Sequence, residues 1–403
     1  MTTKTATSFI SAYASTIEAS ITMEVTALAN QLKAEGKPVI GMSAGEPDFD
    51  TPDYIKEAGI KAIQDGKTKY TAAAGLPALK QIIADKILKD RGVAYDANQI
   101  VVSCGAKHSI FTCLTAIVNP GDEVIFPSPY WVSYPDQVKV LGGVSVVIST
   151  TDATQFKISA DMLRAAITPK TKVLILNSPS NPTGMIYTKD ELKALADVIV
   201  EHQILVISDE IYGKLTYGCE HVSIASLGDD IKQLTLFVDG VSKAYSMTGW
   251  RIGYTAAPKE IAGAMSRVQS HTTSNPTTPS QWASMVALES NDDAIEAMKV
   301  EFVKRKRVMV DRLNAIEGIT CLDPQGAFYA FPNISSFIGK SSSLGDIKSS
   351  VDFCKHLLQE GLVACVPGSG FGAEGYIRMS YATSMDAITT ALDRLKVFAD
   401  SLK

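Results

Sequence analysis

Residues 234–254 read LTLFVDGVSKAYSMTGWRIGY, and the rest of the chain can be arranged around this stretch. Its apolar, β-branched start is typical of a buried strand, and a turn-prone segment with Ser242 and Lys243 follows, with Arg251 eight residues later. Burial at the end of a packed strand lowers the pKa of a lysine and frees its amine to form an imine. Ser242 and Arg251 are suited to hold a phosphate beside it. Because a lone Ser-Lys pair is usually a surface feature, other motifs have to support this interpretation.

Length, composition and charge exclude several classes of protein. At 403 residues the chain is too long for one ordinary core, which predicts two domains. The net charge of -5 argues against a nucleic-acid or anionic-membrane partner, because both bind basic surfaces. No apolar run approaches the ~20 residues that a membrane-spanning helix needs.

The cysteines and histidines predict a cytoplasmic protein without a metal site. The six cysteines contain no C-x-x-C pair, and the five histidines show no ligand spacing such as H-E-x-x-H. These patterns favour neither a disulfide framework nor a zinc site, and they fit a reducing compartment. The first twenty residues lack the charged and apolar regions of a secretion signal.

The order of the predicted elements indicates an α/β fold. Between residues 52 and 301, apolar strands alternate with helices, which predicts a mostly parallel sheet covered by helices on both faces. After a long helix at about 292–317, a smaller α+β unit follows, with a loop at 336–346 and a helix at 346–360. A helix at about 11–36 is predicted to join it. We therefore expect a large domain at 52–301 and a discontinuous small domain made of 1–51 and 302–403.

Several polar motifs come directly after predicted strands. Gly105 and Ala106 open a helix after the strand QIVVS, where free N–H groups can bind phosphate. Asn181 lies in the turn NSPSNPTG after the strand KVLIL. Asp209 ends the strand ILVISD, where a buried carboxylate requires a cationic partner. Because open α/β sheets bind ligands past the carboxyl ends of their strands, these motifs predict a single site.

The pattern S-K-x-x-x-M-T-G-W-R-x-G at residues 242–253 resembles the lysine signature of class I aminotransferases. These enzymes carry pyridoxal 5'-phosphate on a lysine as a Schiff base. The other motifs occur in the order of this family, and the resemblance covers essentially the whole chain. It implies the fold type I of pyridoxal-phosphate-dependent transferases and amino-group transfer by a ping-pong mechanism. Within the family, the chain looks most like the bacterial-type (subgroup I-beta) aspartate aminotransferases.

The resemblance also implies roles for individual residues. Lys243 matches the lysine that holds the cofactor and moves the proton, and Asp209 matches the partner of its ring nitrogen. Tyr212 and Asn181 match the residues that bind its phenolic oxygen, and Trp131 matches the tryptophan that stacks on its ring. The matching residues around the phosphate are Gly105, Ala106, Lys107, Ser242, Arg251 and, from the neighbouring subunit of a homodimer, Tyr70.

The substrate contacts implied by the resemblance point to a dicarboxylic amino acid. Arg378 matches the arginine that binds the α-carboxylate, assisted by the backbone of Gly45 and by Trp131 and Asn181. Lys107 matches the lysine that binds the distal carboxylate, with Thr22 as a supporting hydroxyl. This favours aspartate or glutamate as amino donor and a 2-oxo acid such as 2-oxoglutarate as acceptor. Prephenate and aromatic amino acids stay open as alternative substrates.

Three other functions are compatible with parts of the sequence. A pyridoxal-phosphate-dependent C–S lyase would share the fold and the cofactor lysine. A non-catalytic regulator would only bind the cofactor, but such proteins usually carry a basic DNA-binding appendage, which this chain lacks. A serine hydrolase would use Ser43 in a G-x-S-x-G motif, but that motif must feed a helix and here Pro47 follows it.

Overall fold

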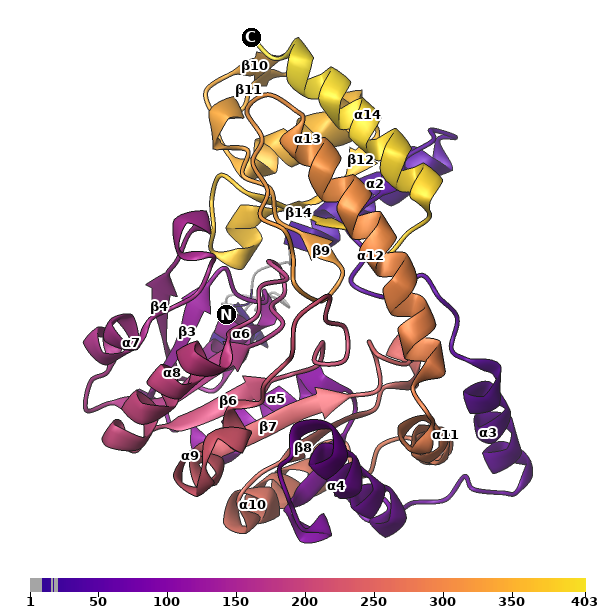
Figure 1. Ribbon diagram of the computed structural model, residues 1–403, viewed down its shortest axis with the longest axis vertical. Helices are drawn as coiled ribbons and strands as arrows, with labels where there is room; N and C mark the ends of the chain where they lie inside the picture. The colour runs from indigo at the N-terminus through magenta and orange to yellow at the C-terminus, as the bar shows by residue number, and fades with distance from the viewer. Residues whose placement is uncertain (1–8, 16, 18–20) are drawn as a thin grey trace, which may run out of the picture.

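The computed structural model describes residues 9–15, 17 and 21–403, with the side chains of these except 12, 13 and 21–24. Within the described residues, a seven-stranded sheet forms the lower part of the molecule in Figure 1. Its strands in spatial order are β2 (Ile100–Ser103), β8 (Gly253–Ala256), β7 (Thr235–Gly240), β6 (Leu205–Asp209), β5 (Thr171–Asn177), β3 (Glu123–Ser128) and β4 (Val144–Ser149). Neighbouring strands are parallel, except that β8 pairs antiparallel with β2 and β7. The predicted α/β fold is confirmed.

Helices cover both faces of this sheet because its central strands are apolar on both sides. In β5, Val173 and Ile175 belong to one core, whereas Leu174 and Leu176 belong to another on the opposite face. The helices over the first face are α5 (Ala106–Ile117), α6 (Ser133–Val140) and α10 (Lys259–Ser270). Those over the second face are α7 (Ala160–Ala166), α8 (Lys189–His202) and α9 (Asp229–Leu234).

Three further helices pack together beside the β2 end of the sheet. They are α3 (Asp53–Gln64), α4 (Pro77–Arg91) and α11 (Thr278–Glu289). Their buried apolar residues, such as Ile55, Leu79 and Ala283, join a core that continues into the upper part of the molecule. This core therefore connects the sheet to the smaller unit above it.

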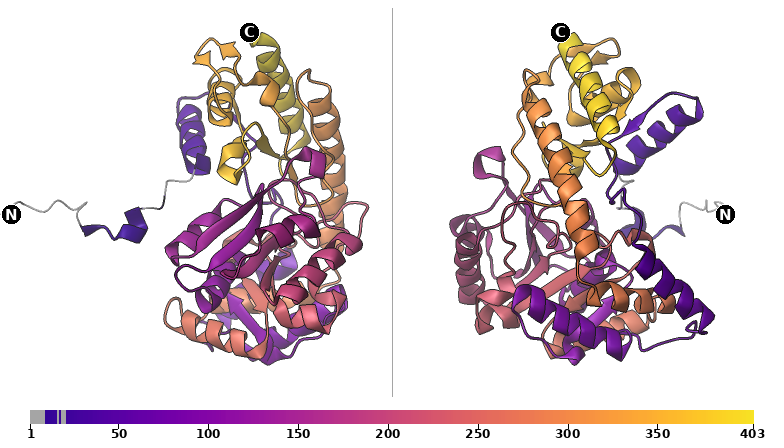
Figure 2. Two further views of the ribbon diagram at one scale, coloured as in Figure 1. Left: turned by 90° about the vertical axis from the view of Figure 1, so that its left-hand side faces the viewer. Right: turned by 45° about the vertical axis from the view of Figure 1, so that its right-hand side comes forward.

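The smaller unit combines segments from both ends of the chain. Strand β1 (Ile40–Gly41) pairs parallel with β12 (Val363–Ala364), and Figure 2 shows helix α2 (Ile21–Ala34) beside the C-terminal elements. Its other elements are the antiparallel strands β13 (Val366–Pro367), β14 (Ile377–Ser380) and β9 (Tyr329–Ala330), and the helices α13 (Ser350–Glu360) and α14 (Met385–Ser401). The long helix α12 (Asp293–Asn314) runs between the two parts (Figure 1). We propose the predicted division into 52–301 and 1–51 with 302–403 for this arrangement.

Two predicted element boundaries differ from the structure. The helix expected at about 11–36 is described as two, α1 (Ala12–Ser15) and α2. The helix expected at 346–360 begins at Ser350, because Ser349 caps it by accepting a hydrogen bond from the amide of Asp352. The preceding segment, expected to be a loop, contains the hairpin of β10 (Ser341–Ser342) and β11 (Gly345–Asp346). No helix in the described part of the chain is long and apolar enough to cross a membrane.

Candidate active site

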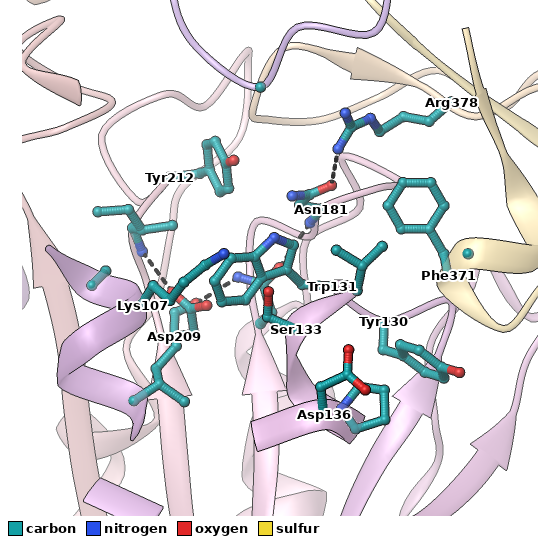
Figure 3. Close-up of a pocket in the computed structure, with 18 of the residues that line it drawn as sticks. Lys107, Tyr130, Trp131, Ser133, Asp136, Asn181, Asp209, Tyr212, Phe371 and Arg378 are labelled. Carbon is teal, nitrogen blue, oxygen red and sulfur yellow. Dashed lines mark hydrogen bonds between the residues drawn. The ribbon is translucent and has the colours of Figure 1, made fainter. Parts of the chain in front are cut away.

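A cavity of about 940 Å³ lies past the carboxyl ends of β3, β5, β6 and β7, where it faces β14 of the smaller unit (Figure 3). Parallel strands place their carboxyl ends along one edge, which is where such sheets bind ligands. Most of the residues predicted for the site line this one cavity: Gly45, Ala106, Lys107, Trp131, Asn181, Asp209, Tyr212, Ser242, Lys243, Arg251 and Arg378. The loop after each strand therefore brings residues that are far apart in sequence to a common space.

Lys243 follows β7 and extends its amine into the cavity. Its Nζ donates a hydrogen bond to the carbonyl oxygen of Gly45, at 2.5 Å. Burial lowers the pKa of Lys243 to about 8, against the opposing effect of the nearby Glu46 carboxylate. About a tenth of the amine is thus unprotonated at pH 7, far more than for a lysine with an ordinary pKa, and this form can react with a carbonyl group.

Asp209 is the last residue of β6, and its carboxylate is buried below the centre of the cavity (Figure 3). The phenol of Tyr134 donates a hydrogen bond to Oδ2 at 2.6 Å, and the amide of Ile211 donates a longer one to Oδ1 at 3.4 Å. Burial raises the pKa of Asp209 to about 6, although the hydrogen bond from Tyr134 lowers it. The carboxylate is therefore mostly ionised at neutral pH and would gain from a cationic partner.

The start of α5 forms a seat for a phosphate. The backbone N–H groups of His108 and Ser109 are the first in this helix to donate a hydrogen bond within it, both to the carbonyl oxygen of Gly105. The N–H groups of Ala106 and Lys107, which come before them, have no acceptor within the helix and can bind an anion. Gly105 has φ +91°, and a Cβ there would lie 2.5 Å from Nη2 of Arg251. Only glycine therefore lets the guanidinium approach the helix start so closely.

Arg251 is held in place at this seat by two carbonyl oxygens. Its Nη1 donates to the carbonyl of Thr248 at 2.9 Å and its Nη2 to that of Cys104 at 3.2 Å. Ser242, which is buried in the loop after β7, lines the same cavity. A cationic fork, a hydroxyl and free helix amides are the donors that a phosphate requires.

Trp131 and Asn181 flank the space above Asp209. The indole of Trp131 makes an edge contact with Tyr134, with ring centroids 5.5 Å apart. The backbone N–H of Asn181 donates to Oδ1 of Asn177 at 2.7 Å, and Nδ2 of Asn177 in turn donates to the backbone carbonyl of Asp209 at 2.9 Å. Trp131 is thus held by a ring contact and Asn181 by hydrogen bonds, and the latter connect it to the end of the strand that carries Asp209.

Tyr212 reaches the cavity from the turn after β6. Its hydroxyl shares a hydrogen bond of 3.0 Å with the hydroxyl of Tyr329 from β9. Burial, together with Tyr329, raises the pKa of Tyr212 well above its ordinary value, so the phenol stays protonated. It can therefore donate a hydrogen bond to an oxygen of a bound ring.

Arg378 enters the cavity from β14. Its Nη1 donates to Oδ1 of Asn181 (Figure 3) and its Nη2 to the carbonyl of Ser43, both at 2.9 Å. Its Nε is buried without a partner, and its guanidinium carbon lies 4.4 Å from the ring centroid of Tyr329. A planar cation with an unsatisfied donor in a ligand-sized space is suited to bind a carboxylate.

Lys107 lies at the side of the cavity, whereas Tyr70 and Thr22 are predicted site residues that come from other parts of the chain. Lys107 holds its Nζ 4.8 Å from the ring centroid of Trp131, and burial, with Arg251 adding to it, lowers the pKa of Lys107. Tyr70 is 90 % exposed and does not line the cavity of its own chain. Thr22 is the second residue of α2, and its side chain lies outside the described residues.

The arrangement fits pyridoxal 5'-phosphate on three independent grounds. The glycine-dependent seat at α5 suits its phosphate, and the buried Asp209 suits a protonated ring nitrogen. The amine of Lys243, which lies in the same cavity, suits its aldehyde.

The model of the family "Aminotransferase class I and II" matches residues 37–395. The chain belongs to this family. It is 49% identical over 383 residues to an aspartate aminotransferase of Geobacillus stearothermophilus, covering 95% of this chain and 96% of the relative. It is also 46% identical to an aspartate/prephenate aminotransferase of Nitrosomonas europaea, covering 94% of this chain and 96% of that one.

A solved structure leads to the same family. The aspartate aminotransferase of Rhizobium meliloti superposes with a TM-score of 0.95 at 43% sequence identity, over 98% of this chain and 99% of the other. The predicted family, the fold type and the cofactor are confirmed, because class I aminotransferases use pyridoxal 5'-phosphate.

Several residues in or next to the cavity were not predicted from the sequence. Tyr134 contacts Asp209, Tyr329 contacts both Tyr212 and Arg378, and Phe371 packs on Arg378 with 5.1 Å between the guanidinium carbon and the ring centroid. Tyr329 and Phe371 come from aromatic segments that resemble ordinary core. Only Tyr134 could have been found from the sequence: it lies three residues after Trp131, at the start of a helix, a spacing that places the two side chains close together.

Proposed function

We propose that the protein transfers the amino group of aspartate or glutamate to a 2-oxo acid, with Lys243 as the residue that holds the cofactor and moves the proton. The observation that carries this proposal is the placement of the Lys243 amine, the Asp209 carboxylate and the Arg378 guanidinium around one cavity. The names of relatives that are 44–49% identical over nearly the whole chain agree with this activity.

Pyridoxal phosphate, when bound, supplies an electron sink for the bond that is broken at the Cα of the amino acid. The amine of Lys243 would hold the aldehyde of the cofactor and, once displaced by the amino acid, would accept the proton from Cα as a base and later return it as an acid. Asp209, whose carboxylate is buried, would pair with the ring nitrogen of the bound cofactor and keep a positive charge on it. Arg378 exchanges its bonds to Asn181 and Ser43 for the α-carboxylate of the substrate. Because the same residues serve both substrates, the first product leaves before the second substrate enters, which gives ping-pong kinetics.

The preference for a dicarboxylate rests on Lys107. Its ammonium is placed over Trp131 at the side of the cavity, where a second carboxylate would find a cationic partner. We expect Lys107→Ala to lower kcat/KM for aspartate by about 10-fold or more, while kcat/KM for alanine or phenylalanine changes little. Steady-state kinetics with this panel of amino donors measure the effect.

A matched control for this change is Lys193→Ala, which removes an exposed lysine on α8 that pairs with Asp197. It should leave all of these kinetic constants unchanged. An equal loss for aspartate and phenylalanine in Lys107→Ala would show that Lys107 serves the cofactor phosphate alone. In the same assays, prephenate as acceptor tests the second activity in the name of the Nitrosomonas relative, and pyruvate release without an acceptor tests the C–S lyase alternative.

We further propose a homodimer in which Tyr70 reaches the cofactor phosphate of the partner subunit. The side chain of Tyr70 is almost fully exposed, and the nearby α3 exposes Ile60 at 55 % and Ile63 at 59 %. Large apolar side chains on one helix face are typical of a surface that another chain covers. The predicted cytoplasmic location stays a prediction.

This dimer makes a prediction for two variants. Ile63→Asp should convert the protein to a monomer with weak cofactor binding, because it places a charge in the apolar contact. Tyr70→Phe should keep the dimer and raise the dissociation constant of the cofactor by about 10-fold, through loss of one charge-assisted hydrogen bond. Sedimentation velocity and equilibrium dialysis measure the two effects. Val397→Asp, on the 70 % exposed side chain of Val397 in α14, is the control and should change neither.

A further inference from the structure

Tyr134 is a buried tyrosine that the proposed chemistry has not used. It is the second residue of α6, it is 2 % exposed, and its phenol donates to Oδ2 of Asp209 at 2.6 Å. Its ring packs edge-on against Trp131 and lies 6.1 Å from the ring of Phe126, measured between centroids. The two rings restrict the orientation of the Tyr134 ring, and its hydroxyl contacts the Asp209 carboxylate.

The hydrogen bond from Tyr134 is the principal contact of the Asp209 carboxylate with the protein. The hydrogen bond that the backbone amide of Ile211 donates to Oδ1 is long at 3.4 Å. A buried carboxylate held by one long bond would be free to rotate and costly to keep ionised. The phenol therefore decides both where the charge lies and how well it is stabilised.

We propose that Tyr134 is a positioning residue for amino-group transfer, which holds the Asp209 carboxylate ionised and aimed at the ring nitrogen of the bound cofactor. This inference rests on the proposed role of Asp209. Burial and the neighbouring Asp209 charge raise the pKa of Tyr134 well above its ordinary value, so the phenol remains a donor throughout the working pH range. It acts through Asp209 and does not itself touch the substrate.

The sign of the electrostatic effect follows from the groups around Asp209. Burial raises its pKa to about 6, Tyr134 and the amide of Ile211 lower it, Glu210 raises it, and Lys243 from the loop after β7 lowers it. Tyr212, from the turn after β6, also acts electrostatically on this carboxylate and is itself protonated. Loss of the phenol removes a stabilising contact of the ionised form, so the pKa of Asp209 rises toward neutrality.

Tyr134→Phe tests the proposal because it removes the hydroxyl and keeps the ring that packs on Trp131. In the holoenzyme we expect kcat to fall about 10-fold and the dissociation constant of pyridoxal phosphate to rise about 10-fold, as for loss of a hydrogen bond to a charged group. The acid limb of the pH–rate profile should move to higher pH by about one pH unit. Equilibrium dialysis, steady-state kinetics over pH and the pH dependence of the cofactor absorbance measure these effects.

Tyr187→Phe is a matched control, since its buried hydroxyl accepts a hydrogen bond from the amide of Ile158, away from Asp209. It should lower the melting temperature without moving the pH profile or the cofactor affinity. Wild-type pH dependence and cofactor affinity in Tyr134→Phe would overturn the proposal. An equal shift in both variants would assign Tyr134 a structural role only and would overturn it as well.

Incorporation of 3-fluorotyrosine at position 134 gives a second test that leaves the packing almost unchanged. The more acidic phenol is a stronger donor, so the acid limb should move to lower pH, and an unchanged limb would count against the proposal even if Tyr134→Phe failed to fold. The outcomes also separate the two inferences. A wild-type protein that does not transaminate aspartate, but whose Tyr134→Phe variant still loses cofactor affinity, would contradict the proposed substrate and leave the role of Tyr134 intact.

Discussion

Replacing Lys243 by alanine is expected to lower kcat for aspartate and 2-oxoglutarate by about 10⁴-fold, the upper range for a positioned acid–base group. The amine lies in the cavity with a pKa of about 8, and no other lysine that lines the cavity within the described residues follows a central strand of the sheet. The fold should remain, because the side chain gives only one hydrogen bond to the protein, to Gly45. Steady-state kinetics and the thermal melting curve check both statements.

Borohydride treatment of the holoenzyme provides the direct measurement for this variant. Peptide mass spectrometry should find a pyridoxyl group fixed to Lys243 in the wild-type protein and none in Lys243→Ala. Lys306→Ala removes another buried lysine, one that pairs with Asp323, and should cost stability while keeping turnover and labelling. Labelling of a different lysine in the wild type would contradict the assignment.

The second large effect is expected for Asp209→Asn, with kcat lowered by about 10³-fold. An amide of the same shape cannot keep a positive charge on the ring nitrogen, and the loss of one preorganised electrostatic group costs this order of magnitude. In the wild type, the rate should fall at acid pH as the carboxylate takes up a proton, and this should happen below the pKa of about 6 of the cofactor-free chain, because the charged ring nitrogen lowers that pKa. In the variant this dependence should be absent, and pH–rate profiles of kcat measure the difference.

Asp209→Glu serves as the comparison for this prediction, since it keeps the charge but displaces it by one methylene group. It should retain more activity than Asp209→Asn and should keep the acid limb. If Asp209→Asn worked within ten-fold of the wild type, the charge below the ring would not be part of the mechanism.

The central strands could be predicted from local patterns, and the proposed role of Lys243 also rests on such a pattern. Strands such as β5 and β7 can be recognised in the sequence as apolar runs, because helices bury both faces of the sheet. The lysine signature around Lys243 and the turn at Asn181 are local in sequence, and each follows such a strand. Short strands such as β10 and β11 escaped prediction because two residues carry no periodicity.

By itself, the sequence determined the α/β class, the family and the cofactor, because each of these leaves a contiguous pattern, and the same patterns led to the proposed cofactor-binding residues at the strand ends. Only the tertiary structure decided which side chains support them, such as Tyr134 beneath Asp209 and Tyr329 beside Arg378. Tyr134 and Asp209 are 75 positions apart in the sequence, and their contact depends on the packing of helix α6 against the end of strand β6. Hydrogen bonds and burial between distant segments leave no periodic signal in the chain, and yet they set the pKa of Asp209 on which the proposed chemistry depends.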